Sequence, residues 1–380
     1  MATGNAPQAR GHWSEWAESR PYTLGVEEEV MLLDARHGWS LAQRIEDVLP
    51  VLGPGLRAHA TAETHRGAIE LATDPQPGVD AAATQLVDLR DALVTDLAPL
   101  GLRAASAGTH PCAMWSDTEI AGDERHQEVY DSMRELARRE PTFALHVHIG
   151  VPDPESGIRL HNRLRGHLAL LLALSANSPF WQGRDTGLAS ARIPIFQAFP
   201  RAGVPRSFAD YAEYVETVDL LLRCEAFPEP TFLWWDIRPQ PSLGTVEVRI
   251  MDAQSRSGST RALVALLLSV AHLELEEERP APADLPELLA ENRFIAARDG
   301  LEARLIDPVA ETRIPARDML ASLLRAVRPH ADELGCRDAL EDVAAIAREN
   351  GAARQLRIAR ERGSLAAVVE TLSDDFCSRP

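Results

Sequence analysis

The chain has 380 residues, of which 57 are acidic and 39 are basic, so its formal net charge is -18 at pH 7. A surface this acidic argues against binding to nucleic-acid phosphates or to anionic lipid, so we expect neither a nucleic-acid nor a membrane partner. All 39 basic side chains are arginines, and the lack of lysine excludes a P-loop, a protein-kinase site and Schiff-base or pyridoxal chemistry.

The predicted elements begin after a polar segment, residues 1–20, which we expect to be a flexible lead-in because it has no apolar stretch of the signal-peptide kind. The β-rich and alternating runs that follow predict six strands: Tyr22–Leu33, Ala68–Thr73, Leu102–Ala107, Phe143–Gly150, Phe232–Arg238 and Thr245–Met251.

Helical patterns lie between these strands and dominate the chain after residue 252. They predict helices at Ala81–Leu97, Arg125–Arg139, Arg159–Ala176, Phe208–Leu222, Ser257–Glu277, Leu285–Arg298, Ala316–Val327, Arg337–Arg348 and Leu365–Ser373. The strand pattern stops within residues 251–259. We therefore predict a sheet-containing catalytic region at residues 21–252 and a helical region at residues 253–380, packed together as one structural unit.

The irregular alternation of strands and helices, with several half-polar strands, favours an α+β fold over a doubly wound parallel sheet. We expect an antiparallel or mixed sheet with one face open to a cavity. Four widely spaced cysteines show neither a disulfide nor a zinc pattern, and no apolar run approaches the ~20 residues of a membrane span. These features predict a cytoplasmic protein.

Four of the predicted strands combine an apolar face with a polar one. Because side chains alternate across a strand, Glu27 and Glu29 share one face, and Glu28 lies on the other face between two valines. Glu70 likewise lies opposite two aliphatic residues. The remaining two strands place further polar residues on one face: His146 and His148 in one strand, and Thr245, Glu247 and Arg249 in the other.

If these strands pair in one sheet, their polar faces form a cup that contains at least Glu27, Glu29, Glu70, His148 and Glu247. Crowded carboxylates repel one another and gather cations, and oxygen-rich ligation with an occasional imidazole suits Mg²⁺ or Mn²⁺. Any one such strand is more often an ordinary amphipathic strand with a solvated face. We interpret His146 as a structural histidine and Glu28 as a structural carboxylate, either paired or at a sheet edge.

A second cluster follows the helix that ends near residue 176. Residues 178–187 are rich in proline, glycine and polar side chains, which predicts a long functional loop. Arg184 in this loop, and Arg192 and Arg201 after it, are able to form bidentate pairs with a carboxylate or phosphate. An arginine-rich surface loop explains these residues equally well. Arg238 shares a predicted face with Asp236, and a plain salt bridge between these two is the alternative to a binding role.

Gly108-Thr109-His110-Pro111 predicts a turn whose function the local sequence leaves open. The chain has no GxSxG elbow, HExxH helix or GxGxxG turn, so serine hydrolase, zincin and Rossmann interpretations lack their usual signals.

Six segments of the chain, in order, resemble the glutamate-cysteine ligase type 2 family, and specifically its carboxylate-amine ligase subgroup. They read GVEEE, ELAT, AGTHP, HVHIG, SPFWQGRDTGLAS with the later FPRAGVP, and WDIRPQPSLGTVEVRIMDAQ. The similarity runs from about Tyr22 to Asp252 and continues more weakly through the helical tail.

The resemblance implies an α+β fold whose mainly antiparallel sheet forms a funnel, as in glutamine synthetase, with ATP and Mg²⁺ or Mn²⁺ on its inner face. It implies metal ligation by Glu27, Glu29, Glu70, His148 and Glu247. ATP would contact Glu27, Glu29, Glu247 and Arg249. The catalytic arginines would be Arg249, Arg192 and Arg184, and the substrate would meet Arg184, Arg192, Arg201 and Arg238.

The function implied is an ATP-dependent carboxylate-amine ligase that forms an amide through an acyl phosphate, with a small carboxylic acid and an amine as substrates. We expect a homodimer. Two alternatives remain open at this point: a metal-dependent hydrolase that uses the same Glu and His cluster with a bound water, and a nucleotide-binding regulatory relative without turnover.

Overall fold

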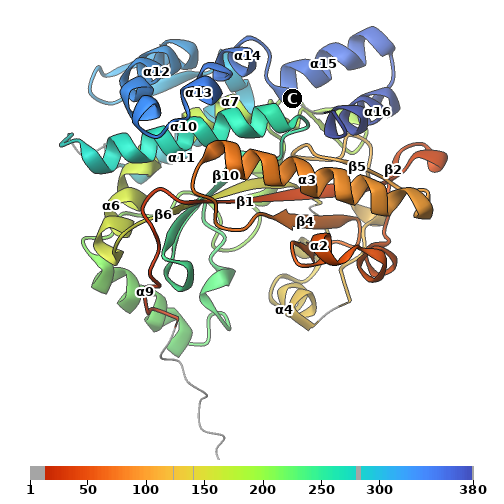
Figure 1. Cartoon of the computed structure of the whole chain (residues 1–380), viewed down its shortest axis with the longest axis horizontal. Helices are drawn as coiled ribbons and strands as arrows, with labels where there is room; N and C mark the ends of the chain where they lie inside the picture. Colours follow the sequence, from red (N-terminus) through yellow and green to blue (C-terminus); the bar gives the residue numbers. More distant parts are fainter. Residues whose placement is uncertain (1–12, 123, 140, 280–283, 379–380) are drawn as a thin grey trace, which may run out of the picture.

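The computed structural model describes residues 13–122, 124–139, 141–279 and 284–378. At its centre lies an open sheet in which all strand pairs are antiparallel and the path runs β3-β4-β1-β6-β10-β9, with β2 and β5 also pairing with β1 (Figure 1). The strands are β1 Leu24–Asp34, β2 Ser40–Leu41, β3 Ala60–Ala62, β4 Ala68–Ala72, β5 Arg103–Ala105, β6 Ala144–Gly150, β9 Ile237–Gln240 and β10 Thr245–Asp252. The predicted α+β fold class with a mainly antiparallel sheet is confirmed.

The first strand shows why one sheet face is a core and the other faces a cavity. Along β1, Leu24, Val26 and Val30 are buried on one side, while Glu27 and Glu29 are only partly covered on the other. The buried side joins the main hydrophobic core, so each strand is fixed in register by its apolar half.

Helices cover the apolar face of the sheet. They are α3 Val79–Leu97, α6 Pro154–Leu164, α7 Leu168–Ser175 and α10 Ser257–Glu276 (Figure 1). Helix α10 is long and apolar enough to cross a membrane, but 83% of that stretch is buried inside the molecule, as expected for a core helix. Its side chains pack against α3, α6, α12 and β6.

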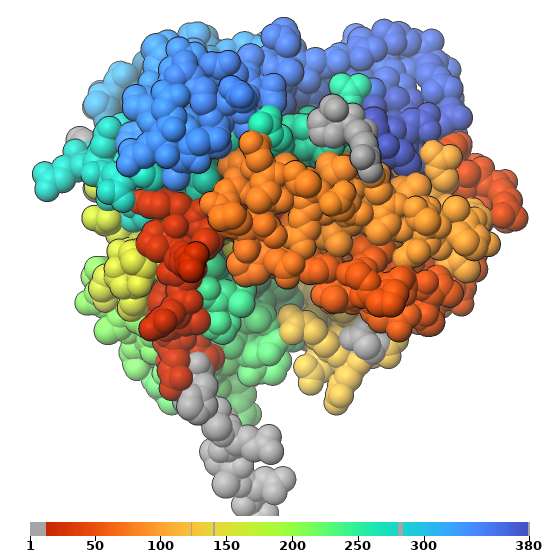
Figure 2. Space-filling view, in the orientation of Figure 1, coloured from red at the N-terminus to blue at the C-terminus, as the bar shows by residue number. Residues whose placement is uncertain are grey.

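The C-terminal part stacks further helices above α10, and Figure 2 shows these residues in blue across that side of the molecule. The helices are α11 Pro286–Asp299, α12 Ala316–Glu333, α13 Arg337–Glu341, α14 Val343–Arg348, α15 Gly351–Arg362 and α16 Leu365–Phe376. We expected this region to be helical. It also contains a hairpin, which is formed by β11 Arg304–Asp307 and β12 Thr312–Pro315. Helix α15 was missed, although its signals were present: Asn350 caps its start and Gly363 ends it in a left-handed conformation.

The segments on the opposite, polar side of the sheet include α4 Glu124–Met133, α5 Glu135–Arg138, α8 Arg192–Phe196 and α9 Tyr211–Arg223. Figure 1 places α4 and α9 on the far side of the sheet from α10. The shorter α1 Ile45–Val48 and α2 Pro54–Arg57 precede β3.

Several predicted elements have different bounds in the structure, and among them the helix expected at residues 337–348 divides into α13 and α14. The helix expected at residues 125–139 divides into α4 and α5 because Arg134 has a positive φ of 56°. The helix expected at residues 159–176 begins at Pro154 and divides at a 3-10 turn. The strand expected at residues 232–238 is β9, which begins only at Ile237, and a 3-10 turn occupies residues 230–232.

The predicted lead-in lies partly outside the described residues, which begin at Trp13. From there the segment lies against the body: Trp13 Nε1 donates to Asp219 on α9 at 2.9 Å, and the backbone of Ala17 bonds to Pro241. The boundary proposed at residue 252 stays a prediction, although one core cluster contains residues from both sides of it, among them Val26 and Leu266.

Candidate active site

The strand register sets the polar residues opposite one another in rows. Glu29 on β1 faces Glu70 on β4. Glu27 faces His146 on β6, and His148 faces Glu247 on β10. Residues facing each other across antiparallel strands have Cβ atoms only ~5 Å apart, so this register alone concentrates carboxylates and imidazoles on one surface.

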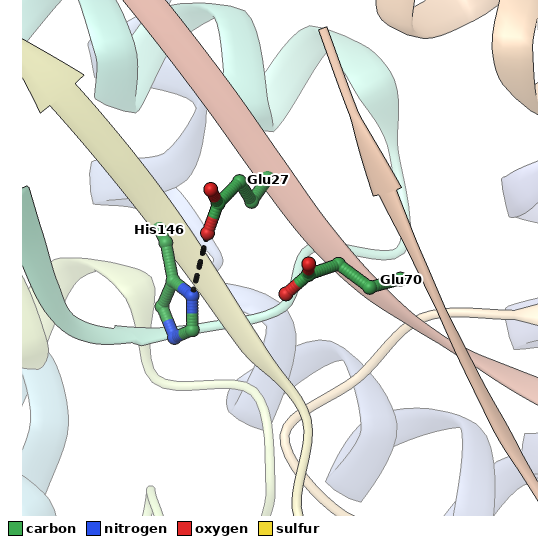
Figure 3. Close-up of side chains that lie close together, drawn as sticks. All are labelled: Glu27, Glu70 and His146. Carbon is green, nitrogen blue, oxygen red and sulfur yellow. Dashed lines mark hydrogen bonds and ion pairs between the residues drawn. The ribbon is translucent and has the colours of Figure 1, made fainter. Parts of the chain in front are cut away.

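Glu27 lies at the centre of this surface and contacts both histidines. Its Oε2 is 3.3 Å from His146 Nδ1, and its Oε1 is 3.2 Å from His148 Nε2. Figure 3 shows Glu27 and His146 in contact, with the Glu70 carboxylate directed toward them from the neighbouring strand. Three donor groups have ligand atoms within 4.8 Å of one another: Glu27, Glu70 and His146; Glu27, His148 and Glu247; and Glu29, Glu63 and Glu70.

The carboxylates differ sharply in their electrostatic surroundings. Burial raises the pKa of Glu29, and the nearby Glu63 adds to this, so that the pKa reaches about 8. Burial and repulsion from Glu27 and Glu63 likewise hold the pKa of Glu70 well above its usual range. Burial also acts to raise the pKa of Glu27, but its contacts with the two imidazoles prevail and lower it.

The pKa values of the two histidines are also shifted in opposite directions. Burial, reinforced by the charge of Arg249, lowers the pKa of His146 to about 4, so this ring is neutral near pH 7. Burial lowers the pKa of His148 too, but the carboxylates of Glu247 and Glu27 outweigh it and hold the pKa above its usual value.

Glu247 is buried and already neutralised by arginines. Arg238 Nε donates to its Oε2 at 2.6 Å, Arg249 donates to its Oε1, and Gln240 donates to Oε2 at 2.6 Å. Burial raises the pKa of Glu247, but the two guanidinium groups dominate and hold it well below its usual range. The salt bridge between Arg238 and Asp236, which we considered as an alternative, was wrong. Arg238 pairs with Glu247, and Asp236 pairs with Arg293 at 2.6 Å.

Arg249 reaches the site from the bulged part of β10. The pairing with β6 shifts register between Val248 and Met251, and Arg249 Nη1 lies 3.4 Å from His146 Nδ1. Alternation alone placed Arg249 on the face of Glu247, and the two side chains are in contact.

Arg192, at the start of α8, is held by the backbone of the same bulged strand. Its guanidinium donates to the carbonyls of Ile250 at 3.2 Å and Arg249 at 3.1 Å, and it lies 3.8 Å from Asp252. Asp252 also accepts from Ser178 and Ser190 hydroxyls, at 2.7 and 2.9 Å. This buried network fixes the loop that carries Arg192.

The polar sheet face and the segments opposite it enclose a cavity of about 390 Å³. On the sheet side it is lined by Glu27, Glu29, Glu70, His146, Arg238 and Arg249, and on the other side by Val129, Arg192, Phe196, Phe199 and Trp234. Arg125 on α4 donates to Glu229 Oε1 at 2.7 Å and to Thr231 at 3.3 Å, so it ties α4 to the segment that precedes β9.

The structure separates the predicted arginines. Arg192, Arg238 and Arg249 line the cavity. Arg184 is exposed in a hairpin formed by β7 Phe180–Trp181 and β8 Arg184–Asp185 and does not line it. Arg201 also lies off the cavity wall; its guanidinium stacks on Trp234, with 5.0 Å to the ring centroid, and donates to a backbone carbonyl at 2.9 Å.

Two residues near the cluster escaped the sequence reasoning. His146 was taken as structural, yet it contacts Glu27 and its buried Nε2 has no hydrogen-bond partner among the described residues. The sequence did contain a signal for this role, because His146 and His148 are two residues apart on one strand and therefore share a face. Glu63, between β3 and β4, carried no strand pattern, so only the hairpin places it beside Glu70.

The AGTHP segment, in contrast, acts as structural support. A Cβ on Gly108 would come within 2.6 Å of the Asp252 carboxyl carbon, so only glycine fits beside that network. Thr109 donates to the Phe180 carbonyl at 2.7 Å, and His110 bonds the Trp39 carbonyl at 2.8 Å.

The donor set fits Mg²⁺ or Mn²⁺. Carboxylate oxygens predominate, a neutral imidazole nitrogen lies among them without a hydrogen-bond partner in the described part of the chain, and burial together with mutual repulsion raises the pKa of two carboxylates. A divalent cation would supply the missing positive charge.

The fold and site therefore define an antiparallel-sheet cup with a carboxylate- and arginine-rich cavity. The model of the glutamate-cysteine ligase family 2 (GCS2) matches residues 23–371, and the chain belongs to this family. A relative from Rubrobacter xylanophilus named "Putative glutamate--cysteine ligase 2-1" is 40% identical over 353 residues, covering 92% of this chain and 94% of the relative. One from Thermobifida fusca, named "Putative glutamate--cysteine ligase 2", is 36% identical over 376 residues, covering 95% and 92%.

Solved structures share the fold. A glutamate-cysteine ligase from Francisella tularensis, in complex with AMP, superposes with a TM-score of 0.71 at 13% identity, covering 96% of this chain and 91% of that one. A bifunctional glutathione synthetase from Pasteurella multocida gives a TM-score of 0.73 at 14% identity, and the match spans 94% of this chain but 52% of that protein.

Proposed function

We propose that the protein is an ATP-dependent carboxylate-amine ligase that forms an amide. The observation that carries the proposal is the convergence of three carboxylates and the His146 imidazole, from three adjacent strands, with three arginines in one cavity; His148 and Glu247 lie beside this group without lining the cavity. Membership in the glutamate-cysteine ligase family supports the ligase class.

We assign metal ligation to the carboxylates and imidazoles of the cup. Glu27, Glu29, Glu70, His148 and Glu247 are the ligands proposed from the sequence, and proximity adds His146 and Glu63. Bound Mg²⁺ or Mn²⁺ would neutralise the charge of the ATP phosphates. Because Glu247 already carries two arginine partners, we expect Glu27, Glu70 and His146 to contribute more to ion affinity.

Arg192 and Arg249 are the arginines proposed to bind the reacting groups. Both line the cavity, and the Nε of each is buried without a hydrogen-bond partner among the described residues. Each therefore has an N–H group available for a phosphate or carboxylate oxygen. Arg238 is held by Glu247 and two carbonyls, which favours a fixed positive charge over direct binding.

Arg184 and Arg201 keep weaker proposed roles because neither lines the cavity. Arg201 stacks on Trp234, which does, so we propose that it positions that ring.

In the proposed reaction a substrate carboxylate oxygen attacks the γ-phosphorus of ATP, and ADP leaves with the electrons of the broken P–O bond. The amine nitrogen then attacks the acyl carbon, and inorganic phosphate leaves. An incoming ammonium first loses a proton to a carboxylate of the cup. Phosphoryl transfer of this kind needs positioning and charge neutralisation, which arginines and carboxylate-held ions supply without lysine.

The test is a screen for ADP and phosphate release with Mg²⁺ and ATP, using glutamate and other acids against cysteine and other amines. We expect release that needs the acid and rises when an amine is added, with amide detected by mass spectrometry. Metal-dependent product formation without nucleotide consumption would refute the ligase and favour a hydrolase. ATP binding by calorimetry without turnover over the whole panel would favour a regulatory relative.

A further inference from the structure

A pair of buried histidines lies in the helical part of the molecule, outside the cavity. His272 on α10 and His330 on α12 are 6% and 7% exposed. Their Nδ1 atoms are 2.9 Å apart, and their ring centroids are 5.1 Å apart. Neither ring lines the catalytic cavity, so the proposed ligase reaction gives this pair no role.

The other nitrogen of each ring faces a carboxylate. His330 Nε2 is 3.2 Å from Glu277 Oε1, and His272 Nε2 is 4.0 Å from Glu333 Oε1. A carboxylate accepts a hydrogen bond, so the 3.2 Å contact favours the proton on His330 Nε2 and leaves a lone pair on its Nδ1. Glu333 is too distant to fix the His272 tautomer, so the 2.9 Å contact needs either a proton on His272 Nδ1 or a cation that both Nδ1 atoms share.

The surroundings hold the pair in this arrangement. The Tyr22 ring lies 4.6 Å from the His272 ring, and its hydroxyl donates to Glu276 Oε1 at 2.5 Å. Tyr22 has a positive φ of 64°, a conformation that is costly for a bulky residue. The aromatic ring thus covers one side of the His272 imidazole, while Glu277 and Glu333 are exposed.

We propose that His272 and His330 bind a divalent transition-metal ion of the Zn²⁺ class through their two Nδ1 atoms. Metal–nitrogen bonds of ~2.0–2.1 Å place two ligand nitrogens about 2.9 Å apart at a right angle and about 3.3 Å apart at a tetrahedral angle. A carboxylate on the outer nitrogen is the usual support of a metal-bound histidine. Water completes the coordination.

The ligand chemistry separates this site from the catalytic cavity. An all-nitrogen pair selects Zn²⁺, Cu²⁺, Ni²⁺ or Co²⁺, whereas the oxygen-rich cup suits Mg²⁺ or Mn²⁺. An ion held by both rings would link α10 to α12, so binding would stabilise the C-terminal helices on the core. The proposal is independent of the ligase activity.

The experiment titrates the EDTA-treated full chain with Zn²⁺ against a chromophoric indicator, with Mg²⁺ in excess to occupy the cup. We expect one Zn²⁺ equivalent that is lost in His272→Gln and in His330→Gln but kept in His146→Gln. The matched control is His37→Gln, a histidine whose side chain is 78% exposed. Zn²⁺ should raise the melting temperature of the wild type and of the control, but not of the two pair variants.

Glu277→Gln keeps both ligands and removes only the outer carboxylate, at a side chain that is 51% exposed. We expect it to fold and to bind this Zn²⁺ about 10–100-fold more weakly, so it serves even where a buried histidine variant fails to fold. The proposal is overturned if the wild type and the two histidine-pair variants bind the same amount of Zn²⁺. A proton shared by the rings, with no metal uptake, would also overturn it.

Discussion

Replacing Glu70 by glutamine should stabilise the metal-free protein while weakening its binding of metal and nucleotide. The variant keeps the side-chain volume and removes one negative charge from a group whose ligand atoms lie within 4.8 Å of one another. At an effective dielectric constant of ~20, two carboxylates at that separation repel by about 3 kcal/mol. Arg249 offsets part of this, so we expect a gain of about 1–3 kcal/mol in the free energy of unfolding.

The sign of the pH dependence follows from the raised pKa of Glu70. Between the unfolded and folded pKa values the folded protein binds more protons than the unfolded chain, so wild-type stability falls as pH rises. The advantage of Glu70→Gln should therefore grow with pH, measured by urea denaturation of the metal-free proteins on both sides of neutrality.

Loss of the same charge should weaken Mn²⁺-ATP binding, measured by calorimetry, by at least the ~10–100-fold typical of a supporting residue at a metal site. The exposed control Glu361→Gln should change the free energy of unfolding by less than about 0.5 kcal/mol. A Glu70→Gln protein that is less stable than wild type and binds Mn²⁺-ATP unchanged would refute the crowded-carboxylate site.

Three further predictions concern groups around the site. Glu247→Gln should lower the free energy of unfolding by about 3–5 kcal/mol in urea denaturation, because it leaves two buried arginines without their carboxylate. Arg90→Met should cost a similar ~3–5 kcal/mol, since it strands Glu28, whose side chain is 0% exposed; a double variant with Glu28→Leu should recover most of that loss. Burial lowers the pKa of His110 to about 4, so from pH 7 to pH 5 the unfolded chain gains a proton that the folded chain does not, and about 2 kcal/mol of stability is lost. His110→Gln should show a correspondingly shallower loss of stability over that interval.

Different results would contradict each of these three predictions. An unchanged urea midpoint for Glu247→Gln would mean that its arginine pairs contribute nothing to stability. A double variant no more stable than Arg90→Met would show that Glu28 is not the stranded charge. Equal pH slopes for wild type and His110→Gln would exclude a buried neutral histidine at that position.

Glu28 shows where local pattern was sufficient and where it ended. Alternation placed it on the apolar face and predicted a structural role, either paired or at a sheet edge; the structure has it buried and paired. Its partner, Arg90, lies 62 residues away on α3 and also donates to the carbonyls of Gln254 and Ser255. Only the packing of α3 against the sheet brings these groups together.

The two histidines of β6 show a different limit. They share a face, and the sequence offered no reason to separate them beyond the resemblance, which favoured His148. The strand register sets His146 against Glu27 and sets His148 against Glu247. Burial, reinforced by Arg249, lowers the pKa of His146, whereas at His148 the carboxylates of Glu247 and Glu27 outweigh burial and raise it.

What the sequence determined by itself was the division of each strand into an apolar and a polar face, because alternation follows from backbone geometry within a few residues. It also carried the motifs of the family to which the chain belongs. The tertiary structure decided which polar residues meet. Strand register sets Glu27 against His146, the turn after β3 brings in Glu63, and the β7–β8 hairpin leaves Arg184 exposed. These placements depend on contacts between segments that are distant in the sequence. The free energy of such contacts cannot be inferred from a local pattern of residues.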